Sequence, residues 1–315
     1  MSDIKLFKVN GTVVDELQGQ AVALERELQS LMEAQLETFL GVRFLDTEYS
    51  TGKTHGGRID SLGIDENNCP VIIEYKRSSN ENVINQGLCY LDWLMDHRGE
   101  FTLLVQKKLG VDASEQIDWS SPRLVCIAGD FNKYDEHAVQ QINRNIELLR
   151  YRWYDEGYLI LELVNAVTGT PVIIDPIGES GSTGSTRSSG SSRSQANQKY
   201  VTDYLAQASI ELQNLYSDLE AQLVALGDDV QQKTLKYYFA FKRIKNFACV
   251  EVHPQSQRLL VYLKVDPATV ALEPGFTRDV TKIGHFGTGD LEVSISSHED
   301  LRRCEAFFLT SYENS

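Results

Sequence analysis

The feature that most constrains this chain is residues 179–198, ESGSTGSTRSSGSSRSQANQ, which contain almost no apolar side chains. Such a segment cannot bury enough apolar surface to offset the entropy of ordering itself. We therefore expect a flexible Gly/Ser-rich linker there. It divides the chain into a first domain over 1–178 and a smaller second domain over 199–315.

The charge and the cysteine content narrow the range of partners. The formal net charge of the chain is −15, whereas proteins that attract nucleic-acid phosphates usually carry a basic surface. A nucleic-acid role must therefore rest on local basic groups or on a divalent metal. The five cysteines are widely spaced and form no C-x-x-C pair, which argues against a disulfide framework and a zinc ribbon. With no apolar run of membrane-spanning length and no signal peptide, we expect a cytoplasmic protein without a membrane partner.

The first domain has the apolar pattern of a layered α/β fold. We expect an opening hairpin in IKLFKVNGTVVDEL, and strands in VRFLDTEY, GRIDSLGI, VIIEYK, FTLLVQK, RLVCIAG and YLILELVN. Helices are expected in AVALERELQSLMEAQLETFL, ended by Gly41, and in VINQGLCYLDWLMDHR and DEHAVQQINRNIELL. Helices before and between apolar strands predict a mixed sheet flanked by helices.

The second domain reads as a small α+β unit. We expect one long helix in VTDYLAQASIELQNLYSDLEAQLVAL, a hairpin in FACVEVHPQSQRLLVYLKV, a strand in LEVSISS and a closing helix in HEDLRRCEAFFLTSY that starts after Ser297. The glycine-rich stretch GHFGTGD, residues 284–290, lacks the G-x-G-x-x-G order of a dinucleotide site, so it predicts a tight turn.

A phosphate-binding loop is the first functional motif to test. Residues 50–54, STGKT, contain the Gly-Lys-Thr ending of a P-loop, but Thr47 stands where the loop needs its first glycine. The following residues read as a strand, whereas the loop must open a helix whose N-terminus faces the anion. We therefore expect no nucleotide cofactor.

The stretch PVIIEYKR, residues 70–77, places charges at the end of a buried strand. Side chains alternate along a strand, so Glu74 and Lys76 point to the same face. The turn-rich DENNCP predicts a hairpin with RIDSLGI, which brings Asp60 opposite Glu74. Directly opposed side chains have Cβ atoms about 4.5–5.5 Å apart.

Two carboxylates this close repel each other, and a divalent metal relieves the conflict. Mg²⁺, or Mn²⁺, accepts a few carboxylate oxygens, polarises a phosphodiester and activates water. Lys76 then orients or helps to deprotonate that water, or stabilises charge on the phosphate. The alternative from the residues alone is a surface ion pair between Glu74 and Lys76.

Gln86 and Tyr90 are four residues apart, so they share one face of the next helix. An amide hydrogen-bonds a phosphate or a water, and an aromatic ring stacks on a base. The alternative is a half-buried helix edge.

Asp60, Glu74-Tyr75-Lys76 and Gln86-x-x-x-Tyr90 together resemble the PD-(D/E)XK nuclease superfamily, particularly its RecB-like and NucS-like members. The resemblance implies a restriction-endonuclease-like mixed sheet flanked by helices. It implies that Asp60 and Glu74 bind the metal, that Lys76 assists the water, and that Gln86 and Tyr90 support the site and the DNA.

The same resemblance implies a further acidic residue on the preceding helix, for which we choose Glu27, with Glu33 and Glu37 as alternatives. Arg58 and Arg77 flank the site as candidates for nucleic-acid binding. Further basic residues cluster in the second domain: Lys233, Lys236, Lys242, Arg243 and Lys245.

The second domain, through RDVTKIGHFGTGDLEVSISSHEDL, resembles a domain of unknown function that follows such nucleases and is sometimes labelled a predicted transport protein. We expect it to serve as a recognition or assembly module.

The function expected from the resemblance is that of a hydrolase, a Mg²⁺- or Mn²⁺-dependent deoxyribonuclease, and an endonuclease in preference to an exonuclease. Such a nuclease would act in DNA repair, restriction or phage defence. The alternative is a non-catalytic module that keeps the nuclease fold to bind nucleic acid or protein. The sequence leaves open RNA as the substrate and a homodimeric assembly.

Overall fold

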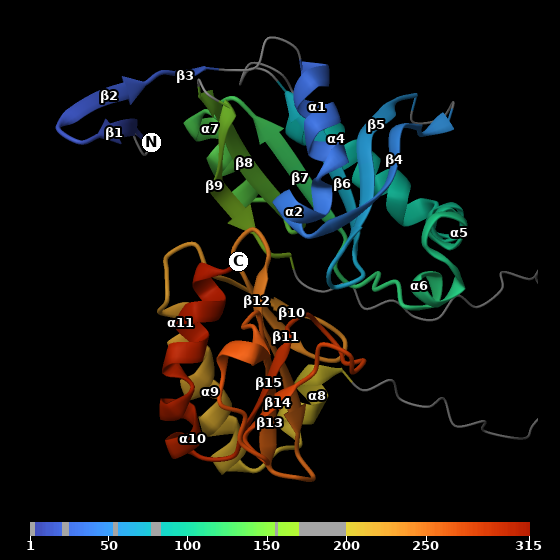
Figure 1. Cartoon of the computed structure of the whole chain (residues 1–315). Coiled ribbons are helices and arrows are strands. Elements are labelled where there is room, and N and C mark those ends of the chain that lie inside the picture. The colour runs from blue at the N-terminus through green and yellow to red at the C-terminus, as the bar shows by residue number, and fades with distance from the viewer. Residues whose placement is uncertain (1–3, 21–24, 53–55, 77–82, 155–156, 170–199) are drawn as a thin grey trace, which may run out of the picture.

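A computed structural model describes residues 4–20, 25–52, 56–76, 83–154, 157–169 and 200–315. Figure 1 shows two sheets, each with helices packed against it, and a small hairpin that extends away from the first sheet. The predicted linker, 179–198, and Arg77 lie outside the described residues, so the linker stays a prediction.

The first sheet has seven strands in the order β3-β8-β7-β6-β5-β4, with β9 beside β8. Strands β6, β7 and β8 are parallel, whereas the pairs β4–β5, β5–β6, β8–β9 and β3–β8 are antiparallel. The predicted mixed sheet is therefore confirmed. Its strands are β3 (Gly19–Gln20), β4 (Val42–Ser50), β5 (Arg58–Asp65), β6 (Pro70–Lys76), β7 (Arg123–Ala128), β8 (Asn145–Tyr154) and β9 (Tyr158–Val167).

Helices cover both faces of this sheet because its central strands are apolar on both sides. Helices α1 (Glu25–Ala34) and α2 (Leu36–Leu40) pack on the face that carries Val71, Ile73 and Tyr75 of β6. Helices α4 (Val83–Asp96) and α5 (Arg98–Leu109) pack on the face that carries Ile72. By the alternation of a strand, Glu74 belongs to the α4 face. The remaining helices are α6 (Val111–Glu115) and α7 (Lys133–Gln140).

Three predictions about the first domain need correction. FTLLVQK forms part of α5 and no strand, because Phe101 and Val105, four residues apart, are the buried side chains and match a helical period. The helix predicted in DEHAVQQINRNIELL ends at Gln140, and NIELL opens β8. The first long helix is divided at Gln35, although Gly41 ends it as predicted, with φ 64°.

The second domain is an antiparallel sheet in the order β10-β11-β12-β13-β15-β14, with helices on one face (Figure 1), which confirms the α+β prediction. Its two predicted long helices are each divided in two, with Ser209 and Ser297 as N-caps. The elements are α8 (Val201–Ala206), α9 (Ile210–Val224), β10 (Gln231–Thr234), β11 (Phe239–Lys242), β12 (Asn246–His253), β13 (Arg258–Leu263), η2 (Pro267–Thr269), β14 (Thr277–Asp279), β15 (Leu291–Ile295), α10 (His298–Arg303) and α11 (Glu305–Glu313).

The predicted opening hairpin is also confirmed, as β1 (Leu6–Asn10) paired with β2 (Val13–Leu17). All five cysteines are free thiols. Among the described helices, none combines the length and the apolar character needed to cross a membrane.

The two domains meet through a buried ionic cluster. Lys242 of the second domain contacts Glu147 of β8, and Lys233 lies 3.8 Å from Asp65 at the end of β5. Arg123 of β7 bridges both carboxylates. The interpretation of Lys233 and Lys242 as basic groups open to nucleic acid is therefore wrong, because these lysines neutralise buried carboxylates of the first domain.

Candidate functional site

The carboxylates of Asp60 and Glu74 lie next to each other where the β5–β6 ladder ends. The last backbone pair of this ladder is Ser61 with Ile73, a register that places Asp60 opposite Glu74 as predicted. Beyond it, the N–H of Asp60 donates to Oε1 of Glu74 over 3.2 Å, and the N–H of Tyr75 donates to Oδ2 of Asp60 over 2.9 Å. Each carboxylate thus binds the backbone beside the other, which fixes both side chains.

Burial makes this pair difficult to ionise. Glu74 is fully buried, and burial together with the neighbouring Asp60 carboxylate raises the pKa of Glu74 to about 9. Burial also raises the pKa of Asp60 to about 6, although the Tyr75 N–H and Lys76 counteract it. A cation between the two carboxylates would favour their charged forms.

The donor set fits a hard divalent cation. Oε2 of Glu74 is buried and has no hydrogen-bond partner among the described residues. Mg²⁺ binds through one or two carboxylates and keeps several waters, so the pair supplies enough protein ligands. Within the described part of the chain, no three His, Cys, Asp or Glu side chains gather into a complete metal cage.

Lys76 lies on the same strand as Glu74, and its side chain is 13% exposed. Its Nζ is 3.4 Å from Oε1 of Glu25, in the first turn of α1. Sequence reasoning missed Glu25, which is the first residue of α1, the helix that packs against β5 and β6. The only signal was its place one helical turn before the buried Leu28.

The three glutamates chosen from the sequence take other positions. Glu27 and Glu37 are exposed, and no contact with the carboxylate pair is observed for them. Glu33 accepts hydrogen bonds from Ser61 Oγ at 2.6 Å and from Gln29 Nε2 at 3.1 Å. Glu25 is therefore the glutamate of α1 that directly contacts a predicted site residue, Lys76.

Gln86 and Tyr90 meet as their spacing predicts. Gln86 Nε2 donates to the Tyr90 hydroxyl over 3.1 Å, and that hydroxyl also accepts the N–H of Arg58 over 3.1 Å. Tyr90 is 5% exposed, so it holds the start of β5 and does not offer an open ring face for stacking. A Cβ on Gly57 would lie 2.4 Å from the Tyr90 hydroxyl, so only glycine allows this approach.

Arg58 is exposed, and its Nη1 lies 3.9 Å from Glu48. The guanidinium is therefore accessible beside Asp60 at the start of β5. The described structure thus brings together Asp60, Glu74, Lys76, Gln86, Tyr90 and Arg58 at one end of the β5–β6 pair.

These features define the chain as a two-sheet α/β protein whose first domain carries a carboxylate pair, formed by the half-buried Asp60 and the buried Glu74. Residues 201–315 match the family described as "Domain of unknown function (DUF5655)". An "Uncharacterized protein" of Haemophilus influenzae is 27% identical over 300 residues, which cover 95% of this chain and 96% of that protein.

One solved structure, titled "Structure of EndoMS-dsDNA2 complex", is 18% identical, with a TM-score of 0.24. The match covers 42% of this chain and 47% of that chain, so it spans less than half of either protein.

Proposed function

We propose that the chain is a metal-dependent nuclease that hydrolyses DNA phosphodiester bonds, with Mg²⁺ or Mn²⁺ as the cofactor. The observation that carries the proposal is the pair of reciprocal hydrogen bonds between Asp60 and the Glu74–Tyr75 segment, which leaves Oε2 of Glu74 buried and without a partner among the described residues. Without a cation, Glu74 would carry a proton at neutral pH because its pKa is raised to about 9, whereas a bound cation would allow both carboxylates to ionise. A metal-binding role accounts for this arrangement, whereas a surface ion pair between Glu74 and Lys76 does not.

Each side chain of the site has a role that follows from its position. Asp60 and Glu74 would hold the cation, which when bound polarises the phosphodiester and activates the attacking water. Lys76, oriented by Glu25, donates toward the phosphate and stabilises the charge that develops on it. Gln86 and Tyr90 fix the Arg58 backbone and so the start of the strand that carries Asp60.

The DNA substrate and the endonucleolytic mode belong to this proposal. The cation and the exposed Arg58 offset the acidic character of the chain where the phosphates would lie. Arg77 is a second candidate for a phosphate contact, and the second domain is a candidate recognition or assembly module.

The test incubates the full chain with single-stranded, duplex and branched DNA, with Mg²⁺, Mn²⁺ or EDTA. Cleavage is expected with metal only, and Asp60→Ala and Lys76→Ala should each lower the rate by about 10²–10⁴-fold. Asp112→Ala and Lys282→Ala, at exposed positions, are matched controls and should cleave normally. Cleavage that survives in both site variants would sink the proposal.

The second candidate is a binding module without turnover. It is favoured by the finding that the described residues supply two carboxylates and no third metal-binding side chain. Calorimetric titration with Mn²⁺ separates the two functions, because a nuclease must bind the metal through Asp60 and Glu74. DNA binding without metal binding would support the module.

A further inference from the structure

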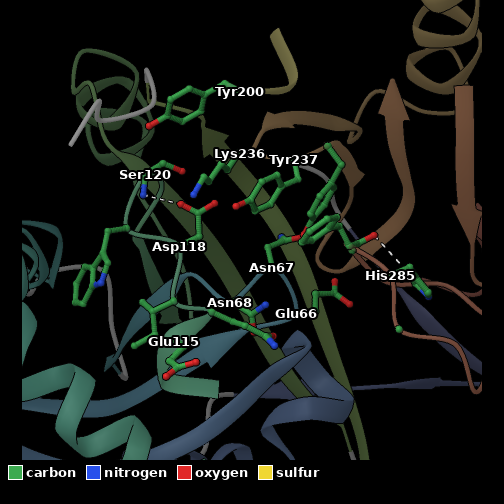
Figure 2. A pocket seen from close by; sticks show the side chains of 17 residues that line it. Glu66, Asn67, Asn68, Glu115, Asp118, Ser120, Tyr200, Lys236, Tyr237 and His285 are labelled. Carbon is green, nitrogen blue, oxygen red and sulfur yellow. Dashed lines mark hydrogen bonds between the residues drawn. The ribbon is translucent and has the colours of Figure 1, made fainter. Parts of the chain in front are cut away.

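A cavity of about 700 Å³ lies between the two domains, at the turn that joins β5 to β6 (Figure 2). Small-molecule sites typically measure about 300–1,000 Å³ and often lie at domain interfaces. The turn begins at Glu66, six residues beyond Asp60, which is about 20 Å along an extended strand. The cavity is therefore separate from the carboxylate pair.

Aromatic rings form much of the wall of this cavity. Tyr237 and Phe286 stack with ring centroids 4.3 Å apart and remain 39% and 50% exposed. Trp119 lines the cavity from the first domain, and Tyr200 from the second. Walls of this kind favour a flat, aromatic ligand.

A hydrogen-bond acceptor and a donor reach the cavity from opposite domains. Figure 2 shows the carboxylate of Asp118, from the first domain, and the ammonium of Lys236, from the second, directed toward the same space. Oδ1 of Asp118 accepts the N–H of Ser120 at 2.8 Å, and Nζ of Lys236 lies 4.9 Å from the centre of the Tyr237 ring. In the described structure no ion pair joins Asp118 to Lys236, so both can serve a ligand.

Ser120 carries, in the wall of the cavity, a hydroxyl group without a hydrogen-bond partner in the described structure. It lines the cavity and is 8% exposed, and its Oγ is buried without a hydrogen-bond partner among the described residues. Buried hydroxyl groups in native structures nearly always have a partner. The Ser120 Oγ has almost no accessible surface, so a ligand atom would reach it only after the Ser120 side chain rotates toward the cavity.

The charge of the lining excludes heavily phosphorylated ligands. Glu115 and Asp118 contribute two carboxylates, against the single ammonium of Lys236, while Glu66 is already paired with Lys264. A polyphosphate would meet net repulsion in this cavity. The ligand that fits is flat, polar at its edge and uncharged.

We propose that this cavity binds a neutral nucleoside through its base. The edge of guanine is the best match, because its ring N–H and exocyclic amine can both donate to Asp118 while O6 accepts from Lys236. The base would stack against the Tyr237–Phe286 pair. This inference goes beyond the proposed nuclease function and does not depend on it.

The test titrates the full chain, without DNA or divalent metal, with guanosine, adenosine, cytidine and uridine, and follows heat and tryptophan fluorescence. Guanosine should bind saturably at one site per chain and more tightly than its monophosphate. Asp118→Asn and Lys236→Met should each weaken binding at least 10-fold. Phe286→Ala should also weaken binding, because it removes one ring of the stacking pair, and it leaves the core intact because Phe286 is exposed. Asp112→Asn and Lys282→Met are matched controls, whose affinity should not change.

Absence of saturable nucleoside binding at 1 mM overturns the inference, and so does binding that both Asp118→Asn and Lys236→Met leave unchanged. A parallel titration with a single-stranded heptanucleotide identifies the source of the base. Binding of the strand alone, with no binding of the nucleosides, also overturns the assignment of a free nucleoside. Because no cleavage is measured, these outcomes are independent of the nuclease test.

Discussion

Nζ of Lys242 in the second domain lies 2.7 Å from Oε1 of Glu147 in the first, and both side chains are buried. Arg123 binds the same carboxylate and also Asp65, which Lys233 approaches from the second domain. The interface thus holds three cations around two carboxylates. Because positive charge is in excess, loss of a carboxylate should lower the free energy of unfolding more than loss of a lysine.

Glu147→Gln should destabilise the chain by about 3–5 kcal/mol, because it leaves three buried cations around one carboxylate. Lys242→Met leaves two cations and two carboxylates, so we expect it to cost less than about 2 kcal/mol. Urea unfolding measures both, with the exposed Lys282→Met as the control. The charge count is wrong if the lysine variant proves the more damaging of the two.

Acid should loosen the same interface. Burial alone would raise the pKa of Glu147, but Arg123 and Lys242 overcome it and lower that pKa to about 2. Lys233 and Arg123 likewise lower the pKa of Asp65 against its burial. The unfolded chain then binds more protons than the folded one, so this stabilisation is complete above the ordinary pKa of 4.5 and is lost as the pH falls toward 2. Tm measured against pH should fall through this window, and less steeply for Glu147→Gln.

Gly57→Ala should destabilise the site end of β5 by about 1–3 kcal/mol, since its Cβ would lie 2.4 Å from the Tyr90 hydroxyl. Gly99, in α5, has open space around it and no positive φ, so Gly99→Ala should stabilise the chain by about 0.5–1 kcal/mol. Thermal unfolding compares the pair. Equal effects would show that Tyr90 does not brace the strand.

The helical acid of the site can be identified by two matched substitutions. Glu25→Gln should lower DNA cleavage by about 10-fold through loss of its contact with Lys76, whereas Glu27→Gln, at an exposed position, should not change it. Single-turnover cleavage rates with Mn²⁺ give the comparison. A selective loss in Glu27→Gln would restore the sequence-based choice.

Mn²⁺ should stabilise the folded chain through the carboxylate pair. A ligand present at 100 times its Kd adds about 2.7 kcal/mol to the free energy of unfolding. We expect a matching rise in Tm for the unmodified chain and none for Glu74→Gln, which keeps the shape of the side chain. A rise of the same size in Glu74→Gln would place the bound metal elsewhere.

Short-range patterns made much of the candidate site predictable. The register that brings Asp60 to Glu74 follows from one hairpin, and the contact of Gln86 with Tyr90 follows from one helical turn. The choice between Glu25 and Glu27 did not follow, because both occur in the same helical run and only the packing of α1 against the sheet brings Glu25 to Lys76. FTLLVQK was misread for a related reason, since a short apolar run fits a strand or a helix until its neighbours are known.

By itself the sequence determined the elements whose contacts are local: the buried β6, the hairpin that aligns the carboxylates and the glycine that ends α2. Only the tertiary structure decided the surroundings of Lys233 and Lys242. The sequence suggested that they belong to a basic surface, but both are buried beside carboxylates of the first domain. Lys242 and Glu147 are 95 residues apart in the chain. No local periodicity links groups so distant, because their interaction exists only after both sheets have folded and excluded water from the space between them.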